Sequence, residues 1–298
     1  MKTLLRIALA LVLIGIGGVI VFGIVAGDSI ENVFTEDNSY VYDEKTYSID
    51  EFDSINISLE NKRITVLPSE NDEIKLEYYF SDKDPVTVAI TDNTLEVENE
   101  TEWFVGFFNM FSFIKNPAYS QFNLYLPTSF GLDLSLSSMN GQIEVSDLNQ
   151  FQDLTIWTSN GEIDLSNVEV AGDLSMHSSN GKLVIDDSTV LGSVVMYTSN
   201  GRVNIDGLTA LDVEVTTSNG DIDCQNVTTD NLDLSTSNGV VEVQVNGAFE
   251  DYYLKMSTTN GSYYLNETKV IQNSYHDSLS KKIECHSSNG NIRVNFSS

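Results

Sequence analysis

The segment LTIWTSNGEIDL, residues 154–165, decides the fold. Aliphatic side chains stand at alternate positions on both sides of a central Asn160-Gly161 pair. An apolar period of two is typical of a half-buried β-strand, and Asn-Gly is typical of a turn. The segment therefore predicts two short strands joined by a turn.

The same pattern recurs along the chain at intervals of about 20 residues, which is the mark of a repeat architecture. The Asn-Gly pairs are Asn140-Gly141, Asn160-Gly161, Asn180-Gly181, Asn200-Gly201, Asn219-Gly220, Asn238-Gly239, Asn260-Gly261 and Asn289-Gly290. Six residues before each Asn the side chain is Leu, Val or Ile, and three residues after it only Tyr263 departs from this rule. One such unit cannot bury its apolar side alone, whereas stacked units can.

Two folds satisfy this pattern. In a parallel β-solenoid, Asn and Gly would adopt the left-handed conformation of a sharp corner, and stacked Asn side chains would form a hydrogen-bonded ladder. In an antiparallel meander, each Asn-Gly would form a type I′ hairpin. A Ser or Thr before Asn repeats as faithfully as the apolar columns, and a hairpin needs no such uniformity. We therefore predict an all-β, parallel β-solenoid of about 20-residue coils over residues 51–298, with regular coils over 132–298.

The two ends of this domain are less regular. Residues 52–97 alternate more weakly and are expected to form irregular leading coils of the same body. The last interval between Asn-Gly pairs is longer, which indicates an insertion at about residues 266–282 that loops out near the C-terminal cap.

The N-terminus predicts a membrane protein. Residues 7–26 carry no charge and match the length of a helix that spans a bilayer. Lys2 and Arg6 precede this run and acidic residues follow it, so the positive-inside rule predicts a cytoplasmic N-terminus and an extracellular domain. We expect residues 1–27 to be an uncleaved anchor in the cell membrane, with a cleaved signal peptide as the alternative. The acidic stretch 28–50 is expected to be a stalk.

Composition excludes several classes of function. The chain has 44 Asp and Glu against 15 Lys and Arg, for a net charge of −29. Such a surface repels phosphate, so nucleic-acid binding is excluded. The only cysteines, Cys224 and Cys285, cannot form a disulfide scaffold or a four-thiolate zinc site. Both fall in inward columns, about three coils apart, and are expected to be buried thiols.

No residues predict a catalytic, cofactor or metal site. His177, His276 and His286 lie in different repeats without metal-ligand spacing, and no nucleophile or phosphate motif occurs. Because β-helices also carry polysaccharide-active enzymes, we retain an enzyme as the alternative. Its best candidates are Asp221 and Asp223, in neighbouring outward positions of one coil. In a chain of this charge, a solvated acidic face is the better interpretation.

Two features stand out from this acidic outer surface, and the first is an aromatic strip. Trp157, His177 and Tyr197 occupy equivalent positions in three successive coils, and their stacked rings would suit sugar rings or a partner surface. A ladder that merely stabilises the sheet is the alternative. In a second outward column, Glu162, Lys182, Arg202 and Asp221 are expected to pair across coils.

The second feature is the apolar stretch 103–114, which is too short to span a membrane. Its aromatic residues include Trp103, Phe104, Phe107, Phe108 and Phe111. They are expected either to cap the N-terminal end of the solenoid or to contact the membrane or a membrane partner.

Together, Tyr125-Leu126-Pro127, the Leu132-x-Leu134-x-Leu136 alternation and the repeated Ser/Thr-Asn-Gly motif behind one apolar N-terminal run resemble the bacterial putative-adhesin, LiaG-like family of β-strand-repeat proteins. The resemblance covers about residues 50–298 and supplies no catalytic residues. It implies a β-solenoid outside the cell, in a family often linked with envelope stress. We therefore expect a non-catalytic, membrane-anchored binding or structural module whose partner is an envelope glycan or another membrane protein.

Overall fold

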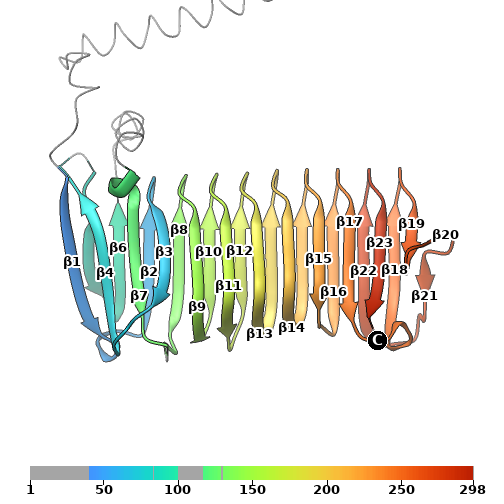
Figure 1. Ribbon diagram of the computed structural model, residues 1–298, viewed down its shortest axis with the longest axis horizontal. Coiled ribbons are helices and arrows are strands. Elements are labelled where there is room, and N and C mark those ends of the chain that lie inside the picture. Colours follow the sequence, from blue (N-terminus) through green and yellow to red (C-terminus); the bar gives the residue numbers. More distant parts are fainter. Residues whose placement is uncertain (1–39, 83, 100–116, 129, 298) are drawn as a thin grey trace, which may run out of the picture.

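The computed structural model describes residues 40–82, 84–99, 117–128 and 130–297, whose strands form one elongated stack (Figure 1). Helix in these residues is limited to three short 3-10 turns, η1 (Ile49–Glu51), η2 (Pro117–Ser120) and η3 (Phe249–Asp251). No helix of the described part has the length and apolar character needed to cross a bilayer. The anchor predicted from residues 7–26 lies outside the described residues.

Two walls of parallel strands enclose the core, and each regular coil contributes one strand to each wall. In spatial order, wall A consists of β6 (Thr94–Asn99), β2 (Ser54–Leu59), β8 (Asp133–Ser138), β10 (Leu154–Thr158), β12 (Leu174–Ser178), the second halves of β13 (Leu183–Thr198) and β14 (Val203–Thr217), β16 (Asn231–Thr236), β22 (Lys281–Ser287) and β18 (Tyr252–Thr258). Wall B consists of β7 (Gln121–Leu126), β3 (Arg63–Pro68), β9 (Ile143–Phe151), β11 (Ile163–Val170), the first halves of β13 and β14, β15 (Ile222–Val227), β17 (Val241–Asn246), β23 (Ile292–Ser297) and β19 (Tyr263–Leu265).

The register between coils follows the repeat. Leu154 of β10 pairs with Leu134 of β8 on one side and with Leu174 of β12 on the other, one repeat away in each direction. All these pairs are parallel, and the strands before and after an Asn-Gly pair lie in different walls. The predicted parallel β-solenoid is therefore confirmed, and the antiparallel meander of Asn-Gly hairpins is wrong.

Each Asn-Gly turn is held by two hydrogen-bonded ladders. The Asn160 side-chain amide donates to Asn140 Oδ1 at 2.7 Å, and the same contact recurs from coil to coil. Beneath it, the buried Thr158 hydroxyl accepts the Gly161 N–H at 3.0 Å and donates to the Gly141 carbonyl at 3.4 Å. The predicted Asn ladder is confirmed, and the hydroxyl bridge explains why Ser or Thr repeats two residues before Asn.

The expected left-handed conformation at Asn-Gly is wrong. Neither residue of any Asn-Gly pair has a positive φ. Glycine is required there for space, because a Cβ on Gly161 would lie 1.9 Å from the Gly141 carbonyl oxygen. Five of the residues with a positive φ mark a second bend, which separates wall B from a short third segment of each coil. They are Asp147, Asn167, Asp187, Gly207 and Asn226.

One apolar core runs through the stack. Alternate residues of both walls point into it, and Leu154 and Ile163 are fully buried. Burial of each such side chain stabilises the fold by about 1.5–3 kcal/mol. Cys224 and Cys285 are buried and free, as predicted. They lie two coils apart rather than three, because the final coil is inserted into the stack.

The order of coils in space departs from the order in sequence at both ends. The C-terminal coil, β22 and β23, lies between β16–β17 and the earlier β18–β19. The predicted insertion, residues 266–282, contains β20 (Thr268–Val270) and β21 (Ser274–Tyr275), which pair antiparallel with β19 and β18 and cover the end of the stack. At the other end, β2 and β3 lie between β6–β7 and β8–β9.

Antiparallel strands complete the N-terminal end. β4 (Glu73–Phe80) extends wall B beyond β7, β1 (Val41–Ser48) pairs with β4, and β5 (Thr87–Thr91) pairs with β6. The prediction of an acidic stalk through residue 50 is wrong over β1. Its side chains alternate between exposed and half-buried, with Tyr47 packed against the core, which suits an edge strand better than a linker.

Candidate functional site

The predicted aromatic strip lies on the outer face of wall A. Trp157 of β10, His177 of β12 and Tyr197 of β13 pair in direct register on consecutive strands. The ring centroids of His177 and Tyr197 are 4.7 Å apart in a T-shaped arrangement. Tyr197 is 37% exposed, and Val195 beside it is 44% exposed. The structure thus brings the three predicted residues together, and their role in binding a ligand stays a prediction.

The same outward column continues toward the C-terminal end with small polar groups. Thr216, Ser235, His286 and Ser257 follow Tyr197 in register. An open groove of about 450 Å³ lies over this part of the column. A second hollow of about 520 Å³ reaches from Val195 toward the same groove. Together the strip and the grooves make one elongated surface, which we call the wall A surface.

Three carboxylates in a neighbouring column make the groove acidic. Glu214, Asp233 and Glu284 pair in register on successive strands and line the groove. Partial burial raises the pKa of Asp233 above its ordinary value, and the negative charges of Glu284 and Glu214 raise it further. The Lys255 ammonium lies 3.6 Å from the Glu284 carboxylate, and Lys255 occupies the next position of the column after Glu284. Sequence reasoning missed this column because acidic outward residues are common in the chain.

The wall A surface carries groups that are chemically suited to binding. Aromatic faces stack against flat apolar surfaces such as those of sugar rings, and the hydroxyl and carboxylate groups accept or donate hydrogen bonds. His276 lies elsewhere, with Nδ1 3.1 Å from the Tyr252 carbonyl oxygen. Within the described ranges, no three His, Cys, Asp or Glu side chains are arranged to hold a metal ion.

The carboxylates considered for the alternative enzyme lie on wall B, away from the wall A surface. Asp221 accepts hydrogen bonds from the Arg202 guanidinium at 2.8 Å and from the Val240 N–H at 2.9 Å. Asp223 accepts one from the Gln225 amide at 2.7 Å. These local partners give both carboxylates a structural role. The predicted pairing across coils is confirmed for Arg202 with Asp221, and for Lys182 with Glu162 at 3.7 Å.

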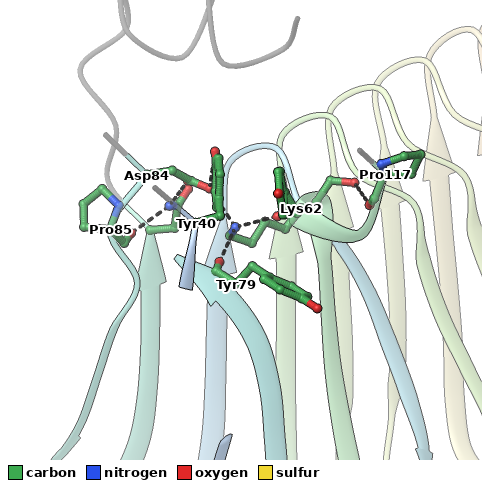
Figure 2. Close-up of polar contacts among 9 residues, drawn as sticks. Tyr40, Lys62, Tyr79, Asp84, Pro85 and Pro117 are labelled. Atoms are coloured by element: carbon green, nitrogen blue, oxygen red, sulfur yellow. Dashed lines mark hydrogen bonds and ion pairs between the residues drawn. The ribbon is translucent and has the colours of Figure 1, made fainter. Parts of the chain in front are cut away.

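A buried ion pair lies at the N-terminal end of the Asn ladder, where Asn61 accepts from the Asn140 amide at 2.7 Å. The next residue is Lys62 instead of glycine, and its side chain is fully buried. Its ammonium donates to Asp84 Oδ2 at 2.7 Å and to the carbonyl oxygens of Tyr79 and Tyr119 at 2.9 and 3.1 Å (Figure 2). Lys62 therefore ties together three segments that are distant in sequence.

Asp84 in turn connects this ion pair to wall A. Its second carboxylate oxygen accepts from the Asn99 amide at 2.6 Å, and the same amide donates to the Pro85 carbonyl at 2.8 Å. Burial lowers the pKa of the Lys62 ammonium below its ordinary value, and the Asp84 charge partly offsets this. A buried charge is tolerated only when paired in this way.

Sequence reasoning missed Lys62, although a signal was present. Ile55 and Ile64 stand six residues before and three after Asn61, as in every repeat. Lys62 stands where the other repeats have Gly, so this extra repeat lacks the Asn-Gly motif.

Tyr40 lies over the same ion pair. Its ring stacks on that of Tyr119 with centroids 4.4 Å apart, and its hydroxyl donates to Asp84 at 3.3 Å. Tyr40 is the first described residue, and Asn99 and Pro117 flank the stretch 100–116 (Figure 2). The predicted contact residues Trp103, Phe104, Phe107, Phe108 and Phe111 belong to that stretch and lie outside the described residues.

Fold and surface together define a parallel β-solenoid with one grooved, partly aromatic wall. The family model Toastrack DUF4097 matches residues 52–295, and the chain belongs to this family. The resemblance to putative-adhesin β-strand-repeat proteins is thereby confirmed for family and fold. None of the curated proteins compared with the chain matches it significantly.

Solved structures share the fold at low sequence identity. A putative adhesin from Parabacteroides distasonis is 15% identical with a TM-score of 0.55, over 87% of this chain and 98% of the other. A putative adhesin from Parabacteroides merdae is 14% identical with a TM-score of 0.50, over 86% and 96% of the two chains. Similarity at this level establishes the architecture, and function must be argued from the surface itself.

Proposed function

We propose that the protein is a non-catalytic, adhesin-like binding module of the bacterial cell surface, and that the wall A surface holds its ligand. The main support is the register of Trp157, His177 and Tyr197, which forms a partly exposed strip whose column continues through Thr216 into the groove. The putative adhesins with the same fold are consistent with this role. A polysaccharide-active enzyme is disfavoured, because Asp221 and Asp223 are held by local partners.

The proposed ligand is an extended envelope glycan. Strands of wall A repeat at about 4.8 Å along the rod, so a polymer lying along the strip would meet an equivalent position on each strand. Rings of Trp157 and Tyr197 would stack on its sugar faces, and hydroxyl groups of the groove would bind its polar edges. Stacking, rather than charge, would carry the affinity.

A binding experiment with matched variants tests this proposal. Trp157→Ala and Tyr197→Ala should each weaken binding of the detergent-solubilised full chain to purified cell-wall glycan, by about tenfold if one stacking contact contributes near 1.4 kcal/mol. Tyr42→Ala is the control, because Tyr42 is 48% exposed but lies on β1, away from wall A. Unchanged binding by both strip variants would make the strip a structural ladder.

We further propose that residues 7–26 anchor the protein in the cell membrane with the domain outside, and that residues 103–114 make a second contact with the membrane or a membrane partner. The charge pattern around the apolar run supports the anchor. Tyr40 stacks on Tyr119, so the start of the domain lies beside the chain that follows residues 103–114. This proximity supports a common location for both apolar segments.

The two tryptophans allow a direct test of this contact. Trp157→Phe leaves Trp103 as the only tryptophan, and Trp103→Phe leaves only Trp157. With the full chain in vesicles that contain brominated lipid, Trp103 fluorescence should be quenched and Trp157 fluorescence should not. Equal emission of Trp103 with and without bromine would exclude a bilayer contact. A pull-down of membrane partners with and without residues 103–114 would then test the protein partner.

A further inference from the structure

β5 (Thr87–Thr91) is the outermost strand of wall A at the N-terminal end of the rod. It pairs antiparallel with β6, and no other strand of the described residues pairs with its second edge. Four of its five residues are exposed, and Ile90 is 44% exposed. A strand edge of this kind presents a row of backbone N–H and C=O groups to which another strand can add.

The other terminal strands of the described rod are protected against such addition. β1, the outermost strand of wall B, carries Asp43, Glu44 and Lys45. At the C-terminal end, β21 covers part of β18, and the three-residue strand β20 closes β19 as a hairpin with Lys269 at its centre. β5 has the sequence TVAIT, without charge or proline, and pairs with β6 without a bulge. Within the described residues, β5 therefore lacks the charges, the proline and the bulge that commonly block edge pairing.

The edge of β5 is also held in a fixed conformation. Asp92 and Asn93 have φ values of 49° and 62°, which form a tight turn of the I′ kind between β5 and β6. Before β5, the Pro85 carbonyl accepts from the Asn99 amide, which also binds Asp84 of the buried ion pair (Figure 2). Both ends of the strand are therefore fixed, and little order would be lost on pairing.

The sequence of β5 is complementary to itself. In an antiparallel pair centred on Ala89, Ala89 faces Ala89 of a second copy, Val88 faces Ile90, and Thr87 faces Thr91. Small, β-branched and hydroxyl-bearing residues each meet their own kind, as an isologous twofold interface requires. We propose that two copies of this chain associate through β5 and join their wall A sheets into one continuous sheet.

Charge is arranged to permit this contact despite the net charge of −29. The outward carboxylates of β6 are those of Glu96 and Glu98, which pair with Ala89 and Thr87 inside each copy. Asp92 follows the end of β5, and in the proposed register the two Asp92 residues would lie at opposite ends of the interface, about 20 Å apart. In the dimer, the two β5 strands separate Glu96 from its equivalent by three strand spacings, about 14 Å. That distance exceeds the screening length of about 8 Å at physiological ionic strength, so repulsion across the interface is weak.

Disulfide trapping of the full chain in membranes tests both the contact and its register. Ala89→Cys places two thiols at the twofold axis, where facing Cα atoms lie about 5 Å apart, within disulfide range. Thr87→Cys alone is the matched control, because two equivalent positions 87 would lie about 14 Å apart. Thr87→Cys co-expressed with Thr91→Cys should restore crosslinking between the two variants. The native Cys224 and Cys285 are buried and should not contribute.

The expected result is a crosslinked dimer from Ala89→Cys and from the mixed pair, and none from Thr87→Cys. Labelling with a maleimide confirms that each new thiol is accessible. Absence of dimer from an accessible Ala89→Cys, or equal crosslinking at position 87, would overturn the proposal. Ala89→Lys should then abolish the dimer seen on native gels, whereas Thr155→Lys on the exposed face of wall A should not. Persistence of the dimer in Ala89→Lys would also overturn it.

Discussion

The Lys62 ammonium and the Asp84 carboxylate lie 2.7 Å apart, and their side chains are only 0% and 3% exposed. The other ion pairs found in the described residues are far more exposed, for example Arg202 with Asp221 at 57% and 41%. A buried pair is costly to break because the remaining charge has no solvent. Together with Tyr40 and Tyr119, the pair holds the strands at the N-terminal end of the solenoid in contact with one another.

Loss of one partner should therefore destabilise the fold more than loss of both. We expect Asp84→Ala to lower the free energy of unfolding by about 3–5 kcal/mol, because it leaves the Lys62 charge buried without a partner. The double variant Lys62→Met with Asp84→Ala should lose less. Arg202→Ala is the exposed control, with a cost of about 1 kcal/mol or less. Urea unfolding measures all three, and an additive double variant would show that the pair is not coupled.

The close approach of stacked turns makes glycine indispensable at the Asn-Gly position. In Gly161→Ala, the new Cβ would lie 1.9 Å from a backbone oxygen that cannot move away without disturbing the next coil. We expect a loss of about 1–3 kcal/mol in the free energy of unfolding. Gly131→Ala is the control, since its nearest neighbour would be 4.0 Å away. Similar losses in both variants would refute the steric explanation.

The hydroxyl ladder should make a separate contribution. Thr198 accepts the Gly201 N–H and donates to the Gly181 carbonyl, both at 3.1 Å, in a buried position. Thr198→Val keeps the shape but leaves two buried backbone groups without this partner, which should cost about 1–3 kcal/mol. Thr155→Val, on the exposed face of wall A, should have little effect. Thermal unfolding measures the stability of the two variants. Equal losses would show that the Thr-to-Val change itself, and not the loss of the buried hydrogen bonds, is responsible.

The acidic groove should make stability depend on pH. Because the pKa of Asp233 is raised above 3.8 in the fold, the folded state binds more protons than the unfolded state in the window above pH 3.8. Stability from this group therefore falls as pH rises through that window. Asp233→Asn should raise the free energy of unfolding at pH 7 by a few tenths to about 1 kcal/mol. The gain should vanish below pH 3.8, and a gain that is the same at both pH values would contradict this cause.

Much of the fold could be predicted from sequence because its signals are local and repeated. The alternation around Asn160-Gly161 defines strand, turn and inward face within twelve residues, and copying it along the chain defines parallel register. The repeat also predicted the strip of Trp157, His177 and Tyr197, since equivalent positions of successive coils must be neighbours. Asp221 and Asp223 could be placed outward by the same rule.

Other features depend on contacts that no local pattern records. The prediction of a left-handed conformation at Asn-Gly is wrong because glycine is favoured both where φ is positive and where a Cβ has no space. The sequence does not distinguish these two causes. The acidic column of the groove could be placed, but not distinguished from other outward acids. The sequence predicts a stalk over the segment of β1, since an edge strand that is exposed at most positions looks polar in sequence.

By itself, the sequence determined the solenoid, its inward and outward columns and the excess of acidic charge on its surface. The reason is that each coil repeats the same short pattern of apolar residues around Asn-Gly. The tertiary structure alone decided which coils are neighbours at the two ends, the burial of Lys62 with Asp84, and the open edge of β5. The physical reason is that all coils share nearly the same apolar columns, so any coil can stack on any other. Only the complete set of end contacts, formed between residues far apart in the chain, selects one order.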